Sequence, residues 1–163
     1  IDPLFIGGGQ EKGIRPGTEN IALIAGMCKA LELSYNSMDE NIAHITSMEK
    51  ILIAELDKHN INYKINGSLR VPGILNITFH DIDGQTLLMN LDMVGVAISY
   101  GSACASGSSK PSSALLSIGI DNETAQKSVR ISIGRFIKKE DVINLVHSIN
   151  SFIPNKKEEK SIG

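Results

Sequence analysis

The sequence predicts an α+β fold built around a small, mainly antiparallel sheet. Two long segments carry apolar residues at helical spacing, and short strands alternate with short helices in the rest of the chain. The 163 residues show no internal repeat and are 42% hydrophobic, which is enough for a single core. The chain is therefore one ordinary globular domain or a piece of a larger one.

The first predicted elements precede residue 60. The chain opens on what resembles a short strand, residues 1–6, and residues 3–17 form a glycine-rich loop whose backbone can approach a ligand closely. Thr18 stands where the N-cap of the first helix is expected. That helix, residues 19–35, has an apolar face of Ile21, Ile24, Cys28 and Leu31. We expect Cys28 to be an inert core residue because it lies on this face.

A second helix is predicted over residues 39–59, and the remaining elements are shorter. The apolar face of the second helix comprises Ile42, Ile45, Met48, Leu52 and Leu56. Strands are predicted at residues 61–66, 74–79, 94–98 and 128–133, and helices at residues 85–92, 115–118, 121–127 and 139–152. The last helix should direct Val142, Leu145, Val146 and Ile149 inward, and residues 155–160 form a charged tail.

Charge and composition exclude several classes of function. The formal net charge is -2 and the basic residues are not clustered, so we expect no direct nucleic-acid partner. No apolar run reaches the roughly 18 residues of a membrane span, and no signal peptide opens the chain. We therefore expect a cytoplasmic protein without a membrane partner.

Cys104 is the clearest candidate for a chemically reactive residue. It lies in the segment 99–113, which holds seven serines and two glycines, so its thiol should be accessible on a flexible loop. On the residues alone, a small side chain filling a tight turn is an equally good interpretation. The four histidines, His44, His59, His80 and His147, match no metal-binding spacing, and we expect no metal site.

Three motifs together identify a family. They are Gly-Gly-Gly-Gln-Glu-Lys-Gly-Ile-Arg-Pro-Gly-Thr at residues 7–18, Gly-Ser-Ala-Cys at residues 101–104 and Ser-Val-Arg-Ile-Ser-Ile-Gly-Arg-Phe at residues 128–136. In this order the chain strongly resembles the NifS/IscS-like cysteine desulfurases, which are pyridoxal phosphate (PLP) enzymes of the class V aminotransferase group. The resemblance spans residues 3 to about 152.

The resemblance implies a role for three residues. Cys104 would be the nucleophile that takes sulfur from L-cysteine as a persulfide while L-alanine is released. Arg130 would bind the α-carboxylate of the substrate, for which the guanidinium geometry is suited. Thr18 would contact the PLP phosphate of the partner subunit in a homodimer, whereas Arg135 is expected to be structural.

The resemblance also implies a division of the chain. Residues 1–33 would be the end of the large PLP-binding domain of a fold-type I transferase, residues 34–153 its small C-terminal α+β domain, and residues 154–163 a flexible tail. In the family, the Schiff-base lysine and the other main cofactor contacts precede the triple glycine. We therefore expect the complete protein to be a cysteine desulfurase and this chain alone to be inactive.

The implied partners are L-cysteine and sulfur-acceptor proteins, such as an iron–sulfur scaffold or a tRNA-thiolation enzyme. Two alternatives remain. The complete protein could be a selenocysteine lyase or another class V PLP enzyme, although a transaminase needs no nucleophilic thiol. Alternatively, the chain could be a non-catalytic module that docks on sulfur acceptors and receives persulfide on Cys104.

Overall fold

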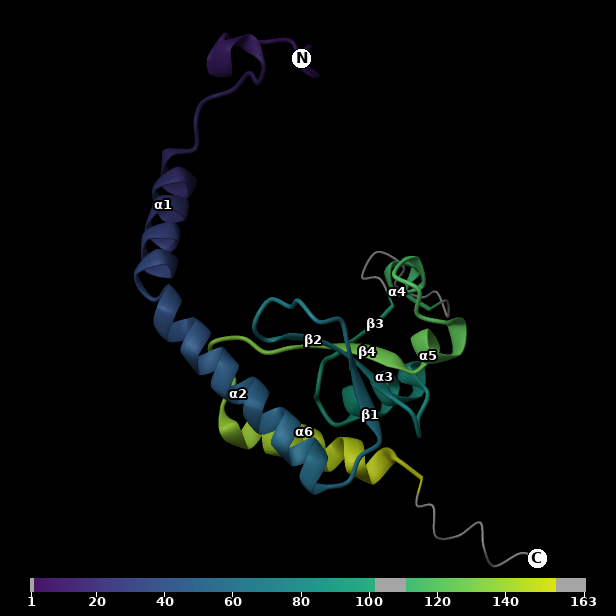
Figure 1. The fold of residues 1–163 in the computed structure, drawn as a ribbon. Helices are drawn as coiled ribbons and strands as arrows, with labels where there is room; N and C mark the ends of the chain where they lie inside the picture. The colour runs from purple at the N-terminus through teal and green to yellow at the C-terminus, as the bar shows by residue number, and fades with distance from the viewer. Residues whose placement is uncertain (1, 102–110, 155–163) are drawn as a thin grey trace, which may run out of the picture. The chain divides into compact units, whose positions relative to one another are not determined.

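A computed structural model describes residues 2–101 and 111–154 of the chain (Figure 1). The structure separates into two compact units, residues 1–40 and residues 41–163. The second unit contains all the strands of the described part of the chain and its hydrophobic core. The mixture of helices with one small sheet confirms the α+β prediction.

The first unit contains a short 3-10 helix, η1 (Gln10–Gly13), and α1 (Ile21–Asn36). Helix α1 forms where it was predicted, but its N-cap is Asn20 and not Thr18, because the Asn20 side chain accepts a hydrogen bond from Leu23 N at 3.0 Å. Asn caps helices at least as well as Thr does, and Asn20 is adjacent to the first helical residue. Residues 2–6 do not form the predicted strand.

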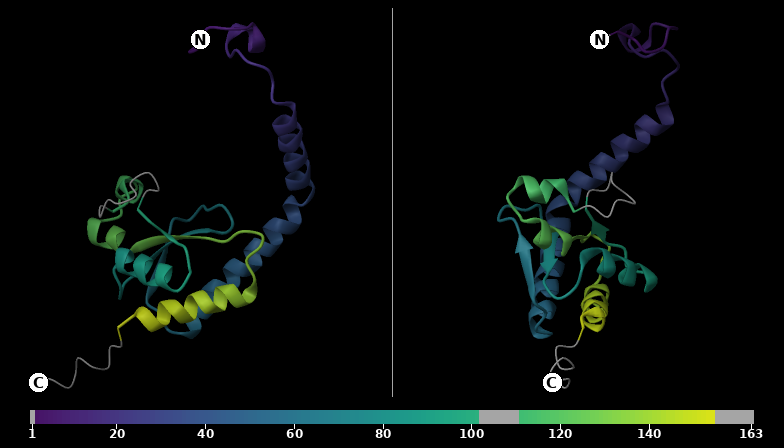
Figure 2. Two further views of the ribbon diagram at one scale, coloured as in Figure 1. Left: turned by 180° about the vertical axis from the view of Figure 1, so that it is seen from behind. Right: turned by 90° about the vertical axis from the view of Figure 1, so that its right-hand side faces the viewer.

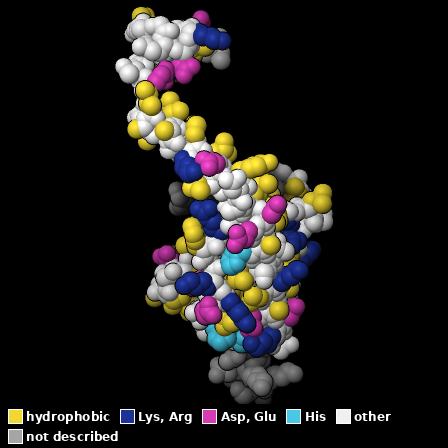
Figure 3. All heavy atoms as spheres, turned by 90° about the vertical axis from the view of Figure 1, so that its left-hand side faces the viewer, with side chains coloured by type: hydrophobic (Ala, Val, Ile, Leu, Met, Phe, Trp, Pro, Cys, Tyr) yellow, Lys and Arg dark blue, Asp and Glu magenta, His cyan; other side chains and the backbone are white. Residues whose placement is uncertain are grey.

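The apolar face of α1 is exposed, which corrects the prediction that Cys28 is a core residue. No residue of α1 is buried, and Ile21 and Leu31 are 76% and 70% exposed. Figure 3 shows hydrophobic side chains along this helix. The helical spacing correctly indicated which residues share a face, but this apolar face is exposed and not buried.

The sheet has the strand order β1-β2-β4-β3 and is antiparallel throughout, as predicted. Its strands are β1 (Tyr63–Asn66), β2 (Ile74–Phe79), β3 (Ser99–Tyr100) and β4 (Ser128–Ser132). Because side chains alternate along a strand, each strand contributes one set to each face of the sheet. One face is apolar and the other carries polar side chains.

The apolar face packs against α2 (Met38–Lys58) and α6 (Lys139–Phe152), which lie on the same side of the sheet (Figures 1 and 2). The predicted inward residues of α6 are all buried, whereas α2 buries only Met48, Leu52 and Leu56 of its predicted face. The sheet adds Leu75, Ile77, Phe79, Val129 and Ile131 to the same core. Helix α3 (Gly84–Met93) completes the core with Leu87 and Leu91.

The strand predicted at residues 94–98 is wrong. Val94 N and Val96 N both donate to the carbonyl of Leu91, so these residues close the end of α3 instead of pairing with a strand. Pairing with β4 begins only at Ser99. Two short helices, α4 (Ser113–Ser117) and α5 (Asn122–Gln126), confirm the remaining predictions before β4.

Among the helices of residues 2–101 and 111–154, none has the length and apolar character needed to cross a bilayer.

Candidate functional site

The polar face of the sheet presents Arg130 near its β3 edge. Arg130 lies in the middle of β4 and its side chain is exposed. It is paired in register with Asn76 of β2 on one side and Ser99 of β3 on the other. Its Nη2 donates a hydrogen bond to Ser99 Oγ at 3.0 Å, which holds the guanidinium over the two strands. The remaining N–H groups can receive an anionic ligand.

A buried polar network lies on the same face of the sheet. Asn66 Nδ2 donates to Asn76 Oδ1 at 2.7 Å and to Thr78 Oγ1 at 2.9 Å. The Thr78 and Ser128 hydroxyl oxygens are 2.8 Å apart, and Ser128 Oγ donates to the carbonyl of Thr124 at 2.7 Å. These bonds fix β1, β2 and β4 to one another and to α5, so the strand that carries Arg130 has a defined position.

Cys104 lies outside the described residues, but the preceding strand is described. Strand β3 ends at Tyr100, and Ser99 of that strand is the partner of the Arg130 side chain. Ser99 precedes Cys104 by five positions in the sequence. The register of the sheet thus places Arg130 beside the strand that precedes the Gly-Ser-Ala-Cys motif in the sequence.

Thr18 lies in the first unit, between η1 and α1. Its side chain is exposed and lines a shallow depression of about 280 Å³ together with Arg15, Asn20 and Leu23. Arg15 forms an ion pair with Glu19. The Asn20 side chain satisfies Leu23 N, one of the N–H groups that the start of a helix otherwise leaves free. The hydroxyl of Thr18, Arg15 and the positive end of α1 remain suited to a phosphate group.

Ser99 and the buried amides were not singled out from the sequence. Ser99 is one of seven serines in the segment 99–113, and only its pairing with Arg130 in the sheet distinguishes it. Arg135 is exposed and its guanidinium carbon lies 4.7 Å from the ring centroid of Phe136, a local cation–π contact. The alternation of polar and apolar residues along the predicted strands could have indicated that Asn66, Asn76 and Thr78 share the polar face of the sheet.

Residues 7–145 match the family model described as aminotransferase class-V. The chain is 37% identical over 169 aligned positions to the cysteine desulfurase IscS of Dictyoglomus turgidum, covering 98% of this chain and 43% of the relative. It is 41% identical to IscS of Clostridium botulinum strain Hall, covering 97% of the chain and 41% of the relative.

The comparison with solved structures agrees with these sequence similarities. A solved NifS-like protein superposes with a TM-score of 0.77 at 28% identity, covering 93% of this chain and 38% of that chain. A NifS-like protein from Rickettsia africae gives a TM-score of 0.76 at 31% identity, with 93% and 40% coverage. The chain thus spans about two fifths of the length of the curated relatives it matches.

The family model covers most of the chain, the curated relatives share more than a third of their aligned residues with it, and solved NifS-like proteins have the same fold. This chain belongs to the aminotransferase class-V family.

Proposed function

We propose that this chain provides the thiol and the carboxylate-binding arginine of a PLP-dependent cysteine desulfurase. The observation that carries the proposal is the exposed Arg130 side chain, held by Ser99 on the strand that leads to Cys104. The similarity to IscS and NifS-like proteins supports the same assignment.

Arg130 orients the substrate. Its guanidinium binds the α-carboxylate of L-cysteine by two parallel hydrogen bonds, while Ser99 restrains the side chain from the opposite strand. In this arrangement the substrate is held beside β3, the strand that precedes Cys104 in the sequence.

Cys104 accepts the sulfur. The Cys104 thiolate attacks the sulfur of the bound cysteine, the bond between Cβ and that sulfur breaks, and a proton is delivered to the carbon as alanine leaves. Cys104 then carries a persulfide that an acceptor protein can take. PLP, where bound, supplies the electron sink that makes breaking the carbon–sulfur bond feasible.

Thr18 would hold the PLP phosphate of a partner subunit through its hydroxyl, with Arg15 and the positive end of α1 as further support. This role requires a homodimer and is therefore part of the proposal. None of the lysines in the sequence matches the family's Schiff-base motif, so the 163-residue chain alone should release no sulfide from cysteine.

The test uses a protein in which this chain follows a PLP-binding large domain, from its own reading frame or from a relative. Sulfide and alanine release from L-cysteine should be lost in the Cys104→Ala variant, while PLP absorbance is retained. Alanine formation that persists without Cys104 would instead favour a lyase. An intact, PLP-loaded protein that releases no alanine, but accepts persulfide from a donor on Cys104, would favour the docking module.

Arg130→Lys provides the second part of the test, with Arg135→Lys as its matched control. Loss of the bidentate contact should lower kcat/KM for L-cysteine by about 10- to 100-fold, mainly through KM. Arg135 is exposed and contacts Phe136, so its replacement should change kcat/KM less than about twofold. Equal effects of the two substitutions would contradict the role given to Arg130.

A further inference from the structure

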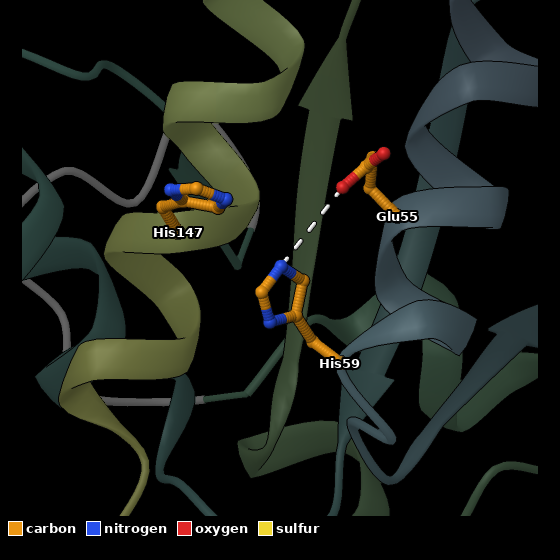
Figure 4. A group of neighbouring side chains, drawn as sticks. All are labelled: Glu55, His59 and His147. Carbon is orange, nitrogen blue, oxygen red and sulfur yellow. Dashed lines mark ion pairs between the residues drawn. The ribbon is translucent and has the colours of Figure 1, made fainter.

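Three potential metal ligands meet where the end of α2 lies beside α6, within the second unit. The ligand atoms of Glu55, His59 and His147 all lie within 4.8 Å of one another. Glu55 belongs to α2, His59 follows the last residue of that helix, and His147 projects from α6 (Figure 4). Glu55 and His59 are four positions apart, which places them on one side of the helix.

The site contains a buried nitrogen without a hydrogen-bond partner among the described residues. His59 Nε2 is inaccessible to solvent and points toward Glu55 Oε2 at 3.9 Å, which is too long for a hydrogen bond (Figure 4). The His147 ring lies edge-on to the His59 ring, with 5.0 Å between the ring centroids. An unpaired buried nitrogen normally costs free energy, and a metal ion would satisfy it.

The electrostatics of the cluster suit a cation. The hydrogen bond from Lys58 lowers the pKa of Glu55, although partial burial opposes this shift, so the carboxylate is ionised at neutral pH. Lys58 Nζ lies 2.8 Å and 3.1 Å from the two Glu55 oxygens and competes for them, but its side chain is 63% exposed and can move into water. Two imidazoles and one carboxylate are a common ligand set for Zn²⁺.

We propose that Glu55, His59 and His147 form a binding site for a divalent transition-metal ion, with Zn²⁺ as the best match. A tetrahedral site requires ligand atoms about 3.3 Å apart. In the structure the ligand atoms lie within 4.8 Å of one another, so they must move closer together to bind the ion. The exposed His147 side chain can do so by rotation, and the fourth position remains open to water. The ion would join the end of α2 to α6, so its effect is on stability, and the site is independent of the proposed desulfurase function.

The test uses the full 163-residue chain, free of affinity tag and metal, with Cys28→Ser and Cys104→Ser so that thiols do not bind the probe. Titration with Zn²⁺ should give one ion per chain, and Co²⁺ should give the visible absorption of a tetrahedral nitrogen and oxygen site. Zn²⁺ at about 100 times its Kd should raise the Tm by about 5–10 °C.

Two variants and one control localise the ion. His147→Ala and Glu55→Gln should each weaken Zn²⁺ binding by about 100-fold or more, and His147 is exposed, so its removal leaves the core intact. His80→Ala removes an exposed histidine outside the cluster and should leave the affinity unchanged. Zn²⁺ binding that survives His147→Ala and Glu55→Gln would overturn the proposal. So would the absence of stoichiometric binding at about 1 mM metal, which would leave His59 and Glu55 as an ion pair only.

Discussion

At the scale of single residues, one carboxylate links α2 to the segment between β1 and β2. Glu49 of α2 accepts hydrogen bonds from Arg70 Nη2 at 2.5 Å and from Gly73 N at 3.1 Å. Burial raises the pKa of Glu49, but the hydrogen bonds from Arg70 and Gly73 and the charge of Arg70 outweigh it and leave the pKa below its ordinary value. The Glu49 side chain is only 12% exposed, so solvent screens this ion pair less than a surface pair.

Replacing Glu49 should therefore remove a stabilising contribution that depends on pH. The lowered pKa means that the contribution is present above the unfolded-state pKa of about 4.3 and disappears as the pH falls through the lower folded-state value. Glu49→Gln should lower the free energy of unfolding by about 1–3 kcal/mol near pH 7, with a smaller difference near pH 3. Urea unfolding at both pH values measures this.

Glu123→Gln is the matched control, because the Glu123 side chain is 80% exposed and forms an ion pair with Lys127, four positions further along the chain. Its effect near pH 7 should stay below about 0.5 kcal/mol. A difference between wild type and Glu49→Gln that is the same at both pH values would show that ionisation of Glu49 is not the cause.

At the scale of elements, the entry into β2 depends on a glycine. Gly73 has φ of +79°, and a Cβ atom there would lie 2.7 Å from the carbonyl oxygen of Ile133 and 2.4 Å from Ile45 Cγ2. The Gly73 carbonyl accepts a hydrogen bond from Ile133 N at 2.7 Å. The end of β4, the start of β2 and helix α2 therefore meet at a point where only hydrogen fits.

Gly73→Ala should destabilise the fold by about 2–4 kcal/mol, because it adds a steric clash with backbone to the strain of a positive φ. Gly67→Ala is the matched control: Gly67 has φ of +84°, but no atom lies within 4 Å of a Cβ placed there. This control should cost only about 1 kcal/mol. Thermal and urea unfolding compare the two variants, and equal losses would contradict the close contact at Gly73.

At the scale of the whole molecule, burial is concentrated in the second unit. Every buried hydrophobic residue of the described chain lies at or beyond Met48, whereas α1 is formed with its apolar side chains exposed. Helix α1 must therefore rely on local hydrogen bonds, and a helix of 16 residues is only marginally stable in water without packing.

In a monomeric sample of the 163-residue chain, the amides of α1 should exchange with deuterium much faster than those of α6, which buries four side chains. Hydrogen exchange followed by mass spectrometry measures the two helices in one experiment, so α6 serves as the internal reference. Strong protection of α1 in a monomer would contradict this expectation. Protection that appears only in a dimer or a longer protein would identify the missing packing partner.

The sequence by itself determined the elements whose signals are local. Helix α6 and strand β2 have the predicted bounds, because a 3.6-residue or two-residue apolar period is set by neighbouring residues and by the face that must be buried. Three motifs were likewise enough to predict the family. The same alternation is seen in β4, where Arg130 is exposed and Val129 and Ile131 on either side of it are buried.

Tertiary structure decided what depends on residues distant in the chain. The pairing of β3 with β4 places Ser99 beside Arg130, and the packing of α2 near α6 brings His147 to Glu55 and His59. Helical spacing did not predict that Cys28 is exposed either, because periodicity identifies an apolar face but not what covers it. Contacts between distant residues depend on how the elements pack, and no local pattern in this sequence records that packing.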